Sequence, residues 1–150
     1  MLRSILMGLA GGQRAMTPLA AVAVAAATGR LPPGNGAPRL LAHPLVAAGA
    51  VVLAMGEMAG DKQPTAPDRI VPIGLVARFS TSALAGAVLA RRRHRVSAAL
   101  LGGLTAVLAS YPGWRVRMAA IPRLGRCSSG LIEDAIVAAS ATAIAGIARR

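Results

Sequence analysis

Residues 40–64 read LLAHPLVAAGAVVLAMGEMAGDKQP. The apolar run from Leu40 to Ala59 has the length, roughly 20 residues, that a helix needs to cross a ~30 Å hydrocarbon core. Two carboxylates, Glu57 and Asp61, and the only lysine of the chain, Lys62, stand at its end. An apolar helix that ends in scarce charged residues predicts a membrane span beside a polar site.

Four further apolar runs accompany this one, over residues 4–28, 70–90, 96–114 and 131–148. None has the polar face of a surface helix on a soluble protein. The first run is interrupted by Gly11 to Arg14 and by Thr17-Pro18, and the third contains Pro72. We therefore expect one all-α integral membrane domain over residues 1–150, a transmembrane helical bundle of four to six spans. Five spans, with interrupted helices near residues 11–18 and 72, fit the runs best.

The composition favours a membrane bundle over a soluble one. Hydrophobic residues make up 55% of the chain and charged residues only 15%, while 2% are aromatic. Small apolar residues suit membrane helices, because lipid gives these helices no hydrophobic reason to associate and close backbone contact must hold them together. The rival interpretation, an Ala-rich soluble bundle, fits the missing polar faces less well.

The net charge of +12 comes almost entirely from arginine. The arginines cluster between apolar runs, without an amphipathic basic helix or aromatic stacking partners, so we expect no nucleic acid partner. Clusters in this position predict binding to anionic membrane lipids. Under five spans, eight basic residues fall on one side and seven on the other, which leaves the orientation open. A cleaved signal peptide is disfavoured, because Arg14 and Pro18 interrupt the first run.

Five acidic residues are present, and four of them could meet. Glu57 and Asp61 share one helix face at a spacing of four, and Glu133 and Asp134 open the last run. With five spans, these two pairs lie on the same side of the membrane. The predicted polar site consists of Arg14, Glu57, Asp61, Lys62, Arg78, Glu133 and Asp134, which Arg115 and Arg117 are placed to join. A purely structural role competes with this, since acidic residues in a first helical turn are favoured by the helix dipole.

Small residues are expected to pack helices closely around the site. Gly8 and Gly12 form one GxxxG pair, Gly56 and Gly60 form a second, and Gly86 lies in the third run. This pattern is weak by itself in a chain with 17 glycines.

Enzymatic motifs are lacking in the sequence. It has no phosphate-binding Walker loop, no HExxH, and no plausible set of Ser, His and Asp. The lone Cys127 excludes a disulfide within the chain, and no Cys or His cluster predicts zinc. The carboxylate pairs would allow Mg²⁺ for chemistry on a lipid phosphate without specifying it. We expect no cofactor, leave the metal open, and favour a non-enzymatic protein.

Several strings in order resemble a family of small bacterial integral membrane proteins described only as a domain of unknown function. They are Arg14 with Thr17-Pro18, then Gly56-Glu57 with Asp61-Lys62, Pro64, Pro67 and Arg69, then Arg78, Tyr111-Pro112-Gly113 with Arg117, and Glu133-Asp134. The resemblance covers nearly the whole chain and implies an inner-membrane helical protein, without an activity, substrate or cofactor. Gln13 and Thr81 depart from the family pattern.

Two functions fit these observations. The first is a small permease or channel-like protein whose polar site carries a proton, ion or small solute. The second is a structural or accessory membrane protein, in which the charges fix helix packing and the arginines hold lipid or a partner. The transported species and the oligomeric state, including a homo-oligomer, stay open.

Overall fold

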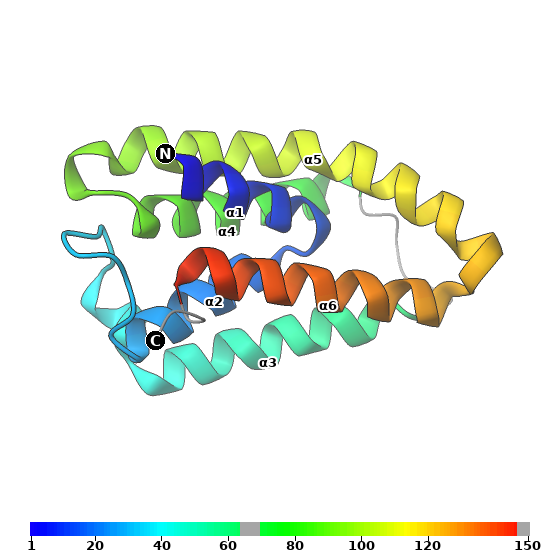
Figure 1. Ribbon diagram of the computed structural model, residues 1–150, viewed down its shortest axis with the longest axis horizontal. Coiled ribbons are helices and arrows are strands. Elements are labelled where there is room, and N and C mark those ends of the chain that lie inside the picture. The colour runs from blue at the N-terminus through cyan, green and yellow to red at the C-terminus, as the bar shows by residue number, and fades with distance from the viewer. Residues whose placement is uncertain (64–69, 147–150) are drawn as a thin grey trace.

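The computed structural model describes residues 1–63 and 70–146. Its elements are six α-helices and two short 3-10 turns, and Figure 1 shows the helices lying roughly along one axis. The bounds are α1 Leu2–Gln13, α2 Met16–Ala27, η1 Arg39–Ala42, α3 Pro44–Gly60, α4 Pro72–Leu89, η2 Arg92–His94, α5 Arg95–Leu124 and α6 Arg126–Ala145. The all-α prediction is confirmed for this part of the chain. The predicted loop residues Pro64, Pro67, Asp68 and Arg69 lie outside it.

The first apolar run forms two short helices rather than one long one. Arg14 has an extended backbone (φ −139°, ψ 118°) and separates α1 from α2, as the predicted interruption requires. Each helix has 12 residues, about 18 Å at 1.5 Å per residue. Met1 lines a hollow together with Pro32 and Asn35, so α1 begins at the end of the molecule to which α2 returns. Figure 1 shows α2 turning back beside the bundle, and we call this pair the α1–α2 hairpin.

The remaining four helices run back and forth along the bundle (Figure 1). Three of them, α4, α5 and α6, are long and apolar enough to cross a membrane, and α3 is a shorter apolar helix of 17 residues. The structure thus supports a multi-pass membrane protein. The hairpin has no helix of spanning length, because its run is divided at Arg14.

Two predicted boundaries differ from the structure. Pro72 begins α4 instead of interrupting a helix, because the first helical position needs no N–H donor. Residues 115–130, between the fourth and fifth apolar runs, are almost entirely helical: α5 continues through Pro112 to Leu124, and α6 follows after Gly125. Gly125 has a φ of 79°, a backbone angle that residues other than glycine rarely adopt. The chain can therefore turn from α5 into α6 at this single residue.

Glycines pack α1 tightly against α4 and α5. A Cβ atom on Gly8 would lie 2.5 Å from the carbonyl oxygen of Gly102, and one on Gly12 would lie 2.8 Å from that of Ala106. Between α4 and α5, a Cβ atom on Gly86 would lie 2.5 Å from the carbonyl oxygen of Ala98. These backbones approach as closely as membrane helices do where small residues face each other.

Gly56 and Gly60 behave differently. A Cβ atom on either residue would have no neighbouring atom within 4 Å, among the residues that the structure describes. The buried residues of α3 are Ala47, Ala50 and Ala54, which lie on the opposite face of the helix at 100° per residue. The second GxxxG pair therefore packs no helix of the described chain.

Large apolar side chains lie on the outside of the bundle. Leu45 on α3 is 75% exposed, Ile73 on α4 is 80% exposed, and Leu108 on α5 is 70% exposed. The interior is filled mainly by alanine, glycine and valine. An outer surface with this many large hydrophobic groups needs a covering, and for helices of spanning length the hydrocarbon of a membrane supplies it.

Candidate functional site

The tip of the α1–α2 hairpin places Arg14 inside the bundle. Its side chain is 1% exposed. Nε donates a hydrogen bond to Oδ1 of Asp134 on α6 at 2.7 Å, and Nη1 lies 2.9 Å from Oδ2 of Asp61 at the end of α3. One guanidinium group thus joins the hairpin to two other helices through charge-assisted hydrogen bonds, which are the stronger kind.

Two further cations complete the arrangement. Arg117 on α5 donates from Nη2 to Oδ2 of Asp61 at 2.9 Å and from Nη1 to Oε2 of Glu133 at 3.1 Å. Lys62 donates from Nζ to Oδ2 of Asp134 and to the carbonyl oxygen of Met58, the latter at 2.8 Å.

We call this group the ion-pair cluster. It consists of Arg14, Asp61, Lys62, Arg117, Glu133 and Asp134. Among the described residues, three positive charges face three negative charges, and four helical segments contribute to the cluster. Taking charges out of water costs several kcal/mol per ion, so burial on this scale requires mutual pairing of the kind seen here.

Glu57 has a different role from the other carboxylates. Its Oε1 accepts from the backbone N–H of Ala15 and its Oε2 from that of Met16, both at 2.7 Å. These N–H groups belong to the N-terminus of α2, where helical backbone donors have no partner in the helix itself. A carboxylate there also meets the positive end of the helix dipole. Glu57 therefore fixes the turn of the hairpin from α3.

The predicted site residues divide into three groups. Arg14, Asp61, Lys62, Glu133 and Asp134 meet in the ion-pair cluster, and Glu57 touches the hairpin tip beside it. Arg78 is buried on α4 at 5% exposure, and it is not among the cluster partners found within residues 1–63 and 70–146. Arg117 joins the cluster, whereas Arg115 is exposed.

The position of Glu133 and Asp134 in their helix differs from the prediction. Because α6 begins at Arg126, they lie in its third turn, and its first turn has no acidic residue. The helix dipole acts mainly on the first turn, so it does not account for these two carboxylates. Their partners are the arginines and the lysine of the cluster.

Three buried polar atoms near the hairpin have no hydrogen-bond partner among residues 1–63 and 70–146. They are Nη2 of Arg14, Oγ1 of Thr17 and Oγ of Ser82. Nη2 of Arg14 lies 4.0 Å from Oε2 of Glu133, which is too long for a hydrogen bond. Within the described part of the chain, the cluster is therefore balanced in charge, and Nη2 of Arg14 is a donor that its carboxylates do not use.

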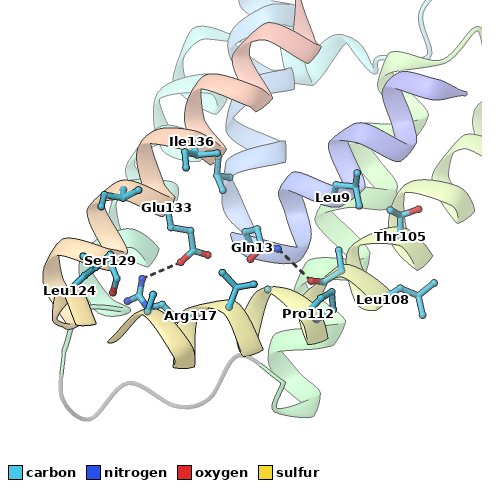
Figure 2. A pocket seen from close by; sticks show the side chains of 16 residues that line it. Leu9, Gln13, Thr105, Leu108, Pro112, Arg117, Leu124, Ser129, Glu133 and Ile136 are labelled. Atoms are coloured by element: carbon cyan, nitrogen blue, oxygen red, sulfur yellow. Dashed lines mark hydrogen bonds and ion pairs between the residues drawn. The ribbon is translucent and has the colours of Figure 1, made fainter. Parts of the chain in front are cut away.

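A groove of about 580 Å³ borders the cluster, between α1, α5 and α6. Figure 2 shows Gln13, Arg117 and Glu133 in its wall, among apolar side chains such as Leu9 and Ile136. A second hollow of about 460 Å³ continues along α6 and shares Leu9, Gln13, Ile136 and Val137 with the first. The Arg117–Glu133 pair of the cluster thus lines an apolar groove.

A metal site receives no support from this geometry. Among the residues that the structure describes, no three His, Cys, Asp or Glu side chains are grouped so that they could hold an ion. The cluster carboxylates face arginine and lysine instead. No protein-family model matches the chain, and no curated protein or solved structure matches it.

Proposed function

We propose that the protein is a small permease of the bacterial plasma membrane, whose polar site is the ion-pair cluster. The position of Arg14 supports this most. Arg14 lies at the tip of the α1–α2 hairpin, is only 1% exposed, and pairs with carboxylates from two other helices. Charged side chains within a membrane domain generally mark a pathway for a substrate or an ion. Interrupted helices whose tips meet such charges are the usual construction of transport sites.

The hairpin also bears on orientation. With α1 beginning at the end where α2 finishes, seven arginines lie at that end: Arg3, Arg30, Arg39, Arg91, Arg92, Arg93 and Arg95. At the opposite end, three described arginines lie outside the cluster: Arg115, Arg123 and Arg126. By the positive-inside rule, we propose that the end with Arg91 to Arg95 faces the cytoplasm.

Flux through proteoliposomes tests the permease proposal. Wild-type protein should carry protons, a monovalent cation or a small anion faster than empty liposomes do. Glu133→Gln should lower that flux, because it removes one charge of the cluster while keeping the side chain's shape. Arg115→Gln removes an exposed charge on the same end and is the matched control. Equal leak in wild type, Glu133→Gln and empty liposomes for all three kinds of solute would rule the permease out.

The balance of the cluster favours one alternative, a structural or accessory membrane protein. Among residues 1–63 and 70–146, three cations pair with three carboxylates, as a purely packing role would require. Replacing a buried ion pair with apolar side chains of similar volume often costs little stability, whereas removing one partner costs much. The double variant Arg117→Met/Glu133→Leu should therefore recover the abundance that Arg117→Met alone loses. A structural protein would then also keep its cellular role, and a permease would fold without transporting.

A further inference from the structure

The apolar groove along α6 extends to Leu124, next to the exposed arginines Arg123 and Arg126. Its lining runs from Leu9 and Thr105 to Leu124 and Ser129, at the elbow where α5 meets α6. Between Thr105 and Leu124 the helix rises about 28 Å at 1.5 Å per residue. The groove is therefore long and narrow, with one end near the centre of the bundle and the other at the elbow.

The side of the groove is accessible from outside the bundle. Val116 on α5 is 70% exposed, and Ile136 on α6 is 61% exposed, although both line it. In a membrane these residues face hydrocarbon rather than water, so a molecule dissolved in the bilayer can enter sideways. The volume of about 580 Å³ lies within the range of 300–1,000 Å³ that is usual for small-molecule pockets.

The elbow carries a net positive charge. Arg123 and Arg126 flank Gly125, Arg115 lies on the same part of α5, and all three are exposed. No acidic residue occurs in the sequence from Ile70 to Ile132. Figure 1 shows the elbow, where α5 turns into α6, projecting beyond the ends of α3 and α4. An anionic headgroup complements this charge, and a cationic one would be repelled.

We propose that the groove binds a single-chain amphiphile with an anionic headgroup, taken from the bilayer. Its hydrocarbon chain lies along α6 against Ile132 and Ile136, and its headgroup lies at the elbow beside Arg123 and Arg126. The chain passes the Arg117–Glu133 pair, which connects the guest to the ion-pair cluster. The inference names a substrate class for the proposed permease and rests on that function for transport, whereas the binding itself is independent of it.

Trp114 provides a built-in reporter of binding. It is the only tryptophan of the chain and lies on α5 between the groove residues Gly113 and Val116. Purified protein in nanodiscs of unlabelled phosphatidylcholine would be titrated with a brominated long-chain fatty acid, whose bromine atoms quench nearby tryptophan. Quenching should saturate for the acid, and its methyl ester should bind about two to five times more weakly, the range of an exposed charge pair.

Two variants separate the groove from ordinary lipid contact. Ala120→Phe fills the groove and should abolish the saturable quenching. Ala119→Phe adds the same ring at an exposed neighbouring position that does not line the groove, and it should leave quenching unchanged. Arg123→Gln/Arg126→Gln should bring the affinity for the acid down to that of the methyl ester.

Three results would overturn the inference. They are non-saturable quenching in wild type, equal quenching in Ala119→Phe and Ala120→Phe, and equally strong quenching by a brominated phosphatidylcholine, which would indicate ordinary lipid contact. Saturable quenching by the acid in a protein that shows no flux would keep the groove as a binding site and remove the permease. Flux that depends on Glu133 without saturable quenching would keep the permease and remove this ligand.

Discussion

The α1–α2 hairpin is held in different ways on its two sides. Toward α4 and α5, glycines bring backbones together, as where Gly8 meets the carbonyl oxygen of Gly102. Toward α3 and α6, small apolar side chains of α2 pack in the core, ion pairs and a carboxylate cap hold the hairpin tip, and two connected hollows remain beside α6. Close backbone contact thus fixes one side of the hairpin, whereas the other side combines small-residue packing with charge pairing at the tip and borders space that a guest can fill.

Removing Arg14 should lower the free energy of unfolding the most, because Arg14 pairs with two carboxylates of the ion-pair cluster. Arg14→Met leaves the partly buried Asp61 and the buried Asp134 with one cation fewer. Loss of one partner of a buried pair costs about 3–5 kcal/mol, and we expect that loss in the free energy of unfolding. Denaturation by SDS in mixed micelles, followed by circular dichroism, measures it. The control Arg123→Met changes an exposed arginine and should stay within about 0.5 kcal/mol. Equal stability of both variants would show that the cluster does not hold the hairpin.

Adding a methyl group between α1 and α5 should lower the stability less than removing Arg14 does. Gly8→Ala places a methyl group 2.5 Å from the carbonyl oxygen of Gly102, so α1 and α5 must separate. Inserting one carbon into a close-packed contact costs about 1–3 kcal/mol, and the same denaturation measures it. Cross-linking α1 to α5 through cysteines at Leu2 and Ser97, in a background without Cys127, should become slower if the helices part. If Gly8→Ala were as stable as wild type, the contact between α1 and α5 would be less tightly packed than the structure shows.

Much of this arrangement could be predicted from the sequence, because hydropathy and charge scarcity are local signals. The apolar runs located α3 to α6, and the rarity of carboxylates singled out Asp61, Glu133 and Asp134. The turn-back of the hairpin could not be predicted, since residues 4–28 are long enough for one span and their reversal depends on Glu57 from another helix. Arg115 and Arg117 are equivalent in sequence terms, and only helical phase against α6 decides which one is buried.

The carboxylate cap that Glu57 forms on the hairpin should contribute moderately to the free energy of unfolding. In Glu57→Gln, one amide oxygen remains to accept a hydrogen bond, but the second acceptor and the negative charge near the α2 dipole are lost. We expect a loss of about 1 kcal/mol, in the range of N-terminal caps. Hydrogen exchange at the N–H groups of Ala15 and Met16, measured by NMR, should accelerate. Unchanged exchange at both groups would show that the cap does not protect the turn.

The smallest change in stability is expected at Gly56, which faces no helix of the described chain. Gly56→Ala adds a methyl group on the exposed face of α3, with no atom within 4 Å, and alanine is preferred to glycine in a helix by about 0.5–1 kcal/mol. The variant should therefore unfold at slightly higher SDS than wild type, in the opposite direction to Gly8→Ala. The two substitutions are chemically identical, so their difference reports only what each glycine faces. A loss of stability in Gly56→Ala, growing with protein concentration, would show that a second copy seats on α3 and that its GxxxG pair packs between chains.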